Sequence, residues 1–453
     1  MKAIPEPAGI QQPLGLAKLW SHFRAKLASG TFLQNVGVLT IANFISAALS
    51  LVQGILVARW LGPEHYGVVG LVLSYPTFVY AFFDARSSEA SVKYLSEYHG
   101  RGEHEGALAM CRIGYVVDLG VACVTFLILA LTARFAAQGI VQDPAVGGLM
   151  VLYGAALIPR ALVGTSNAIF ITLGRFPFNA SIDVTTNLLR LFLVISFVLA
   201  GWQVKGVVWA NAIAAAAAGF LYGVLAWMLI RRTWGAGLFH GGLKALKGGL
   251  RNIFSFLAYN NLNTLIGTIP NQLDLILLGF FRGPTEVGYF RLAKNIAMVV
   301  RFVIKPLQTV TFPTLARLAA LGQGRAFSDN VKKLWVWIGL PAGLLVLVAT
   351  AMISFVLPLL VGEAYLPAVG AAQLLFFGGA FAIAFFWTRP VYLAKGFVRQ
   401  MLIVNSSVTV FFGIFYPFVI HQWGFMGSAA WLVALRMVTI SISGPYLWRQ
   451  MKN

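Results

Sequence analysis

The chain has 453 residues, of which 59% are hydrophobic and 11% are charged, and its mean hydropathy is +0.79. Soluble domains carry about 25% charged residues, so this composition excludes a soluble globular protein. The 34 Lys and Arg outnumber the 14 Asp and Glu, but these cations are divided between short connectors and apolar segments. That distribution argues against a nucleic-acid-binding protein.

Twelve apolar segments are long enough to cross a bilayer, which takes about 20 residues in a helix. The sequence therefore predicts an all-α polytopic membrane protein of twelve transmembrane helices, and the short connectors leave no room for a soluble catalytic domain. The expected spans are 32–58, 67–92, 109–132, 147–172, 179–201, 207–230, 254–281, 288–312, 335–361, 367–393, 400–421 and 425–447.

The positions of the cations outside the spans predict the orientation. With the N-terminus inside, 21 of the 34 Lys and Arg fall on the inner side, and nine fall within spans. Only Arg59, Arg134, Lys205 and Arg282 remain outside. By the positive-inside rule, both termini are cytoplasmic.

The two halves of the chain repeat each other. LGPEHYGVVGL at 61–71 matches RGPTEVGYFRL at 282–292, and in the same alignment Trp202 and Gly206 match Trp423 and Gly427. We call this alignment the repeat register. Each half has six spans, an even number, so both halves enter the membrane from the same side. This predicts two parallel repeats related by an axis along the membrane normal, as in transporters that hold substrate between two lobes.

The repeats predict five regions. A cytoplasmic N-terminal segment and a cytoplasmic inter-lobe connector each hold an interfacial amphipathic helix, since apolar stripes there lie beside Lys and Arg. The expected regions are the N-terminal segment 1–31, the N-lobe 32–230, the connector 231–253, the C-lobe 254–448 and the cytoplasmic C-terminus 449–453.

Charged residues within the expected spans are the candidates for function, because a charge at mid-bilayer is costly and usually faces a partner or a hydrated cavity. Arg291, Lys294, Arg301 and Lys305 share one face of an otherwise apolar helix. We expect this cationic stripe to line a hydrated cavity; the alternative is snorkelling of the outermost members to the membrane surfaces.

Five further cations lie in spans: Arg86, Arg160, Arg190, Arg389 and Arg436. Arg160, Arg190 and Arg436 fall near mid-span and converge on the same cavity if the lobes face each other. The alternative for each of these three is that it caps backbone carbonyls freed by a kink, above all Arg160, which follows a proline. Alternatives for the other two are that Arg389 has a structural or headgroup-binding role near the inner face, and that Arg86 pairs with Glu89.

Asp274 is the leading candidate for ion coupling, ahead of Asp84 and Asp183. We expect its carboxylate to reach Arg291 on the next helix, where it would either exchange a proton or form a static ion pair. The sequence shows no ligand spacing for a metal and no nucleotide-binding glycine pattern, so no metal or cofactor is expected.

The segment ILVARWLGPEHYGVVGLVLSYPTFVYAFFDARSSEASVKYLSEY at 55–98 resembles the bacterial polysaccharide flippases. These are the O-antigen and exopolysaccharide repeat-unit translocases of the multidrug/oligosaccharidyl-lipid/polysaccharide (MOP) exporter superfamily. The resemblance implies a V-shaped, MATE-like pair of six-helix lobes in the bacterial inner membrane. It also implies alternating access driven by a proton or sodium gradient, and an undecaprenyl-diphosphate-linked oligosaccharide as substrate.

The cationic interior agrees with such a substrate, because Arg and Lys pair with diphosphate oxygens. Alternatives are an exporter of another anionic amphiphile or drug and a polymerase or ligase, although the short outer connectors argue against an enzyme. Expected partners are the lipid-linked substrate, membrane lipids and polysaccharide assembly proteins such as a polymerase, with the protein acting as a monomer. Candidate glycan contacts are Asn260, Asn263, Asn271, Gln272 and Trp387.

Overall fold

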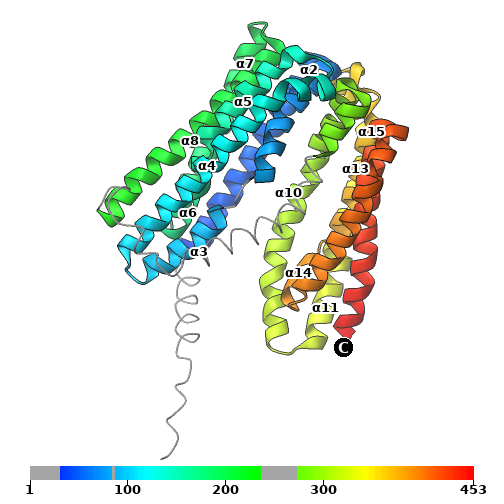
Figure 1. Cartoon of the computed structure of the whole chain (residues 1–453). Helices are drawn as coiled ribbons and strands as arrows, with labels where there is room; N and C mark the ends of the chain where they lie inside the picture. Colours follow the sequence, from blue (N-terminus) through cyan, green and yellow to red (C-terminus); the bar gives the residue numbers. More distant parts are fainter. Residues whose placement is uncertain (1–30, 84–86, 236–272, 453) are drawn as a thin grey trace, which may run out of the picture.

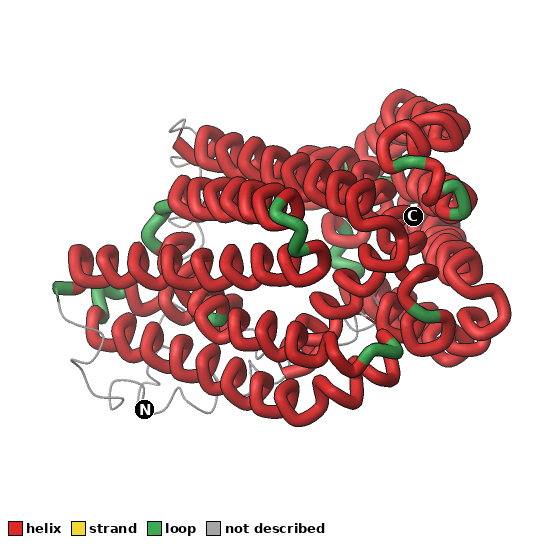
Figure 2. The backbone as a smooth tube through the Cα atoms, turned by 90° about the horizontal axis from the view of Figure 1, so that it is seen from above, coloured by secondary structure: helices red, strands yellow, loops and turns green. Residues whose placement is uncertain are grey.

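The computed structural model describes residues 31–83, 87–235 and 273–452, and all regular structure within these ranges is helical. The helices form two bundles, the N-lobe in blue to green and the C-lobe in yellow-green to red (Figure 1). Seen from above, the same two groups consist of helices joined by short loops (Figure 2). The predicted all-α class is confirmed.

The N-lobe begins with a helix that is broken at a Gly-Pro pair. Gly62 has φ 72° and ψ 172°, outside the helical region, so α2 is two helices joined at a sharp corner. The helices of this lobe are α2 (Thr31–Phe83), α3 (Ser87–Gly100), α4 (His104–Ala136), α5 (Gly147–Arg160), α6 (Leu162–Thr172), α7 (Phe176–Leu199) and α8 (Gln203–Trp234), with the short η1 (Ala137–Val141) and η2 (Pro144–Val146).

The C-lobe follows the same plan. Residues 273–282 are helical and lead into α10 at a second Gly-Pro pair. A further break at Gly424 (φ 55°, ψ −139°) divides the last helix, α15, in two. The elements are α10 (Pro284–Ala320), α11 (Gly324–Leu334), η4 (Trp335–Gly339), α12 (Leu340–Val361), η5 (Glu363–Tyr365), α13 (Ala368–Ala384), α14 (Thr388–Ala394) and α15 (Val398–Lys452).

Eight helical stretches among the described residues are long and apolar enough to cross a membrane. Two of them, Thr40–Phe83 and Val398–Met451, contain the breaks at Gly62 and Gly424, so each holds two expected spans. Helix α10 is not among the eight because its cations lower its hydropathy. Most of the seventh expected span, and both predicted amphipathic segments, lie outside the described residues, so the count of twelve is confirmed only in part.

The two repeats meet each other across the lobe boundary. A Cβ atom on Gly67 would lie 1.8 Å from the Pro284 carbonyl oxygen, and one on Gly288 would lie 1.9 Å from the Pro63 carbonyl oxygen. These pairs exchange places in the repeat register, so an approximate two-fold axis runs between them. Gly62 and Gly283 also share one backbone conformation (φ 72° and 84°, ψ 172° and 177°). The predicted internal repeat is therefore confirmed.

The lobes approach at this end and diverge toward the end that carries α3, α11 and the C-terminus, which gives a V (Figure 1). The Tyr365 hydroxyl donates a hydrogen bond of 3.0 Å to the Ala58 carbonyl and ties the lobes together near the apex. The largest buried apolar cluster draws on both lobes, with Val57, Val287 and Ala368 among its members. The core of the molecule thus lies where the lobes join.

Candidate substrate site in the membrane-spanning helices

The cationic stripe of α10 divides into a part near the apex and a part near the open end of the V. Arg291 and Lys294 lie toward the apex of the V and are partly buried, whereas Arg301 and Lys305 lie nearer the open end and are exposed. The two cations near the apex have protein partners, as described below. The two cations near the open end are accessible, on a helix whose other faces are apolar.

Arg291 joins the lobes. Its Nη1 donates a 2.9 Å hydrogen bond to the Tyr66 carbonyl oxygen, and its guanidinium lies 4.5 Å from the centre of the Tyr66 ring. The Arg291 Cδ occupies the space that a Cβ on Gly70 would need, at 2.9 Å. The contacts therefore indicate a structural role for Arg291 at the apex.

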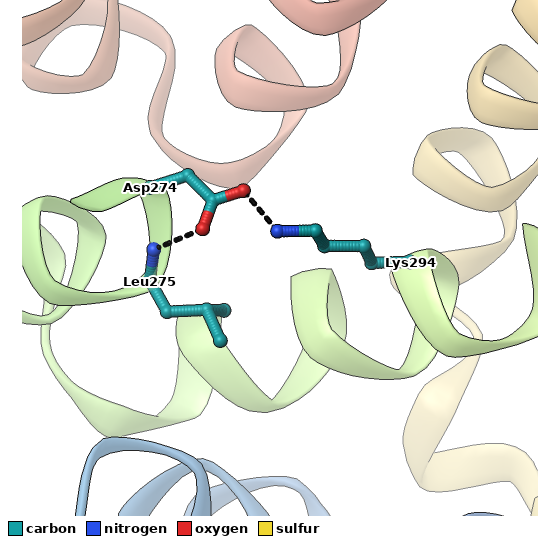
Figure 3. A network of polar contacts seen from close by, with 3 residues as sticks. All are labelled: Asp274, Leu275 and Lys294. Carbon is teal, nitrogen blue, oxygen red and sulfur yellow. Dashed lines mark hydrogen bonds and ion pairs between the residues drawn. The ribbon is translucent and has the colours of Figure 1, made fainter. Parts of the chain in front are cut away.

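Asp274 pairs with Lys294, which corrects the expectation that its partner is Arg291. The Lys294 ammonium donates to Asp274 Oδ2, and Asp274 Oδ1 accepts a 2.7 Å hydrogen bond from the Leu275 amide (Figure 3). The Asp274 side chain is fully buried, while that of Lys294 is 25% exposed. A buried carboxylate of this kind requires its cation, because an unpaired charge in a low-dielectric interior is strongly unfavourable.

Arg301 and Arg436 define a cationic cavity in the C-lobe. Lys294, Arg301 and Arg436 line a cavity of about 220 Å³ whose remaining walls are apolar and include Met298 and Leu432. Arg301 is close enough to act electrostatically on both Arg436 and Asp274. The described residues that line the cavity include three cations and no carboxylate, and Asp274 pairs with one of these cations, Lys294, so the lining carries surplus positive charge and suits an anion.

A second polar cluster lies in the N-lobe on α5, α7 and α8. Asp183 Oδ1 accepts a 3.0 Å hydrogen bond from the Tyr222 hydroxyl. Arg190 Nη2 donates to Asn187 Oδ1 at 2.6 Å and to the Ser50 hydroxyl at 2.9 Å. Arg160, which is exposed, lies close enough to act electrostatically on Asp183 and Arg190.

The two clusters lie at similar depth. Helices α2 and α10 run side by side, with the rings of Phe44 and Phe302 6.1 Å apart. Ser50, which holds Arg190, is six residues from Phe44 along α2, or about 9 Å along the helix axis. Because α2 and α10 are antiparallel here, Arg190 is anchored at a depth between Lys294 and Arg301.

The other predicted site residues are accounted for individually. Arg389 is exposed at the start of α14. Trp387 is 1% exposed and packs near Phe385 and Trp448, so its ring is buried in this conformation. The predicted site residues that lie outside the described residues are Asp84, Arg86, Asn260, Asn263, Asn271 and Gln272.

Several partners were not predicted from the sequence. Tyr222 and Ser50 belong to helices far along the chain from Asp183 and Arg190, and Tyr66 belongs to the opposite lobe from Arg291. Only Asn187 was within reach of pattern analysis, since it is three residues from Arg190 on one helix face. Over the described ranges, no three His, Cys, Asp or Glu side chains gather as metal ligands would.

Comparison with known proteins agrees with this architecture. A lipid II flippase, MurJ, in an inward closed conformation superposes with a TM-score of 0.70 at 15% identity, covering 92% of this chain and 87% of that chain. A multidrug resistance MATE family transporter of the MOP superfamily, in an inward-facing conformation, superposes with a TM-score of 0.66 at 16% identity, covering 90% and 94%. At these identities the likeness establishes the fold, which is the MOP fold.

Sequence comparison identifies the family. The teichuronic acid biosynthesis protein TuaB of Bacillus subtilis (strain 168) is 27% identical over 231 residues, which cover 50% of this chain and 45% of that protein. The match thus spans about half the length of this relative. The model of the family described as "Polysaccharide biosynthesis protein" matches residues 32–319, more than half of the chain. The chain is therefore a multi-pass membrane protein of the polysaccharide biosynthesis protein family, with the fold of the MOP transporters.

Proposed function

We propose that this protein translocates an undecaprenyl-diphosphate-linked oligosaccharide repeat unit from the inner to the outer leaflet of the bacterial inner membrane. The observation that carries the proposal is the cavity of Lys294, Arg301 and Arg436, which combines three cations with apolar walls at mid-depth. A diphosphate is a multiply charged anion whose oxygens accept bidentate hydrogen bonds from guanidinium groups. The family is described by polysaccharide biosynthesis, and its relative TuaB is named for teichuronic acid biosynthesis, which supports a glycan as the cargo.

The V-shaped form supports alternating access. Cation counts in the connectors predict that α3, α11 and both termini lie on the cytoplasmic side. In that orientation the lobes diverge toward the cytoplasm. Arg301 and Lys305, the exposed cations of the stripe, would meet the diphosphate from that side. Arg190 and Arg160 of the N-lobe would supply contacts at similar depth when the lobes exchange positions, while the polyprenyl chain stays in the lipid.

We further propose that ion coupling uses the Asp274–Lys294 pair in the C-lobe. Lys294 belongs both to the ion pair with Asp274 and to the wall of the cationic cavity. A diphosphate that attracts Lys294 competes with the carboxylate, which favours binding of a proton or sodium ion at Asp274. Asp183, held by Tyr222, is the corresponding candidate in the N-lobe. We further propose that the protein works as a monomer and passes its product to polysaccharide assembly proteins.

The decisive test is Arg301→Ala in proteoliposomes that contain a fluorescent lipid-linked oligosaccharide. A charge-assisted hydrogen bond contributes about 1.5–3 kcal/mol, so the flipping rate is expected to fall about 10- to 100-fold, with Arg301→Lys retaining part of the activity. Arg325→Ala, which removes an exposed cation from α11, is the matched control and should flip normally. Full activity of Arg301→Ala, or an equal loss in Arg325→Ala, would contradict the proposed site.

A further inference from the structure

A second cavity lies at the apex end of the N-lobe, where the two lobes meet. Its volume is about 1000 Å³, and its walls come from all three outer turns of the N-lobe. The corner after Gly62 contributes Glu64 and His65, the turn between α4 and α5 contributes Gln142 and Asp143, and the start of α8 contributes residues 202–205. Pro284 of the C-lobe completes the cavity. We call it the outer pocket.

The same place is closed in the C-lobe. Arg282 Nη2 donates to the carbonyl oxygens of His421 and Gln422 at 2.6 and 2.9 Å, at the end of the first half of α15. Glu286 Oε2 accepts a 2.9 Å hydrogen bond from the Phe425 amide, at the start of the second half. The positive Arg282 thus binds the C-terminal end of one half-helix, and the negative Glu286 binds the N-terminal end of the next. This is the arrangement that the helix dipoles favour.

The repeat shows what the N-lobe lacks. In the repeat register, Leu61 stands in place of Arg282 and His65 in place of Glu286. Gln203 stands in place of Gly424, and the first residue of α8 receives no side-chain cap. His65 and Gln203 both line the outer pocket. We call the contacts of Arg282 and Glu286 with the two halves of α15 the C-lobe clamp. The outer pocket lies at the equivalent position of the N-lobe, where the clamp residues are replaced.

The backbone around the pocket is conformationally unusual. Gln142 (φ 64°) and Gln203 (φ 44°) are the two non-glycine residues with positive φ in the described part of the chain. Both line the outer pocket. Left-handed backbone at a non-glycine residue is uncommon and clusters at binding sites. The two amide side chains are thereby carried on tight turns at the pocket wall.

Aromatic side chains provide the largest flat surfaces of the pocket. The Trp202 ring stacks on Phe197 with centroids 5.1 Å apart and an angle of 12°, yet the residue is 51% exposed. Trp209, on the second turn of α8, is 40% exposed and lines the same pocket. A ring braced on one side by Phe197 presents its other side as a rigid platform.

The combined chemistry matches a sugar. Pyranose rings offer an apolar C–H face that stacks on indole, and a rim of hydroxyls that bind amides and carboxylates, both of which the pocket supplies. The charges are mixed, with Glu64 and Asp143 against Lys205, so the pocket does not select a phosphate group. This distinguishes it from the cationic cavity of the C-lobe.

We propose that the outer pocket binds the glycan portion of the delivered product on the outer face. The inference rests on the proposed function, since that function supplies the sugar at this surface. Because Pro284 belongs to the opposite lobe, the pocket is complete only while the outer ends of the lobes are together. A bound glycan therefore stabilises this form and slows further transport when product accumulates outside.

The probe for this proposal is a phosphate-free oligosaccharide mixture released by mild acid from the host cell's own surface polysaccharide. Binding to the full-length protein in nanodiscs is measured by calorimetry and by saturation-transfer NMR. Trp202→Ala is expected to weaken binding at least about tenfold, as the loss of one stacked aromatic contact would. Trp423→Ala, the equivalent residue of the closed C-lobe turn and 61% exposed, is the matched control and should bind normally.

A second variant keeps the test valid if Trp202→Ala does not fold. Gln142→Gly removes an amide from the wall and suits φ 64°, so it should weaken binding without loss of stability. Absence of binding to the wild-type protein would overturn the proposal. So would wild-type affinity in Trp202→Ala and Gln142→Gly, or equal losses in Trp202→Ala and Trp423→Ala, since both Trp would then be membrane-interface anchors.

The two proposals fail separately. Arg301→Ala should stop flipping and still bind the oligosaccharide, because Arg301 lies in the C-lobe cavity and not in the outer pocket. If the wild-type protein flips no lipid-linked glycan but binds the oligosaccharide through Trp202, the proposed function is wrong. If the wild-type protein flips normally and Trp202→Ala binds the oligosaccharide with wild-type affinity, the proposed role of the outer pocket is wrong.

Discussion

Gly288→Ala tests whether the backbone contact at the apex holds the lobes in the observed form. The new Cβ would lie 1.9 Å from the Pro63 carbonyl oxygen, whereas ordinary contacts begin at 3.4 Å. The two helices must therefore separate by about 1.5 Å, the difference between these distances. Overpacking of this kind costs about 1–3 kcal/mol.

The strain acts on the form in which the outer ends touch, and it is relieved when they part. A change of about 2 kcal/mol shifts the equilibrium between the two forms roughly 30-fold toward the outward-open one. Gly67→Ala, the equivalent change in the N-lobe, would place a Cβ 1.8 Å from the Pro284 carbonyl and should act alike. The double variant should shift the equilibrium by less than the sum of the two single shifts, because both changes strain the same helix crossing.

Both native cysteines are first replaced by Ser, and spin labels are attached at Arg101→Cys, beside α3, and Asp329→Cys, on α11. Pulsed electron paramagnetic resonance then measures the distance between the diverging ends of the two lobes. Gly288→Ala should shift the distribution to shorter distances and reduce flipping. Gly120→Ala on α4, where a Cβ meets nothing within 4 Å, is the matched control. A Gly288→Ala distribution and flipping rate identical to wild type would refute the reasoning.

Two further predictions concern the C-lobe. Asp274→Asn should abolish the dependence of flipping on an imposed proton or sodium gradient. It should not weaken substrate binding, because the cationic cavity keeps Lys294 and loses the carboxylate that competes for it. Unchanged gradient dependence would remove Asp274 as the coupling residue. Gly424→Ala should lower the free energy of unfolding by about 2 kcal/mol, measured by thermal unfolding in detergent, since its Cβ would lie 2.1 Å from the Glu286 carboxylate and φ is 55°. Gly413→Ala on the same helix, with open space around it, is the control, and equal stability of the two variants would contradict the clamp.

The fold was largely predictable because its signals are local. Apolar length predicts the spans, and the Gly-Pro motifs at 61–71 and 282–292 predict the repeat, since a sharp corner needs the same residues in both halves. The closed and open turns beside Glu286 and His65 were also within reach, because the repeat register places these two residues at equivalent positions.

The site was less predictable because its contacts are between distant helices. A helical projection shows that Arg291 and Arg301 lie on one stripe, but it does not show which other helices pack against that stripe. Tyr66 of the other lobe, which binds Arg291, was therefore not predicted. For the same reason the sequence analysis paired Asp274 with Arg291. The actual partner is Lys294, about one turn further along α10. Roles in binding and coupling depend on the substrate and stay predictions.

The apex has the geometry of an isologous dimer interface, in which a patch meets its own copy. Gly70 and Arg291 are equivalent positions of the two repeats, and they touch each other, so they lie beside the axis. In a homodimer of half-length chains both positions would hold the same residue. Two arginines would compete for one space and repel, and two glycines would leave it unfilled. In one chain the two halves are free to differ at this point, and the Gly70–Arg291 contact is an asymmetry that a homodimer of identical halves could not have.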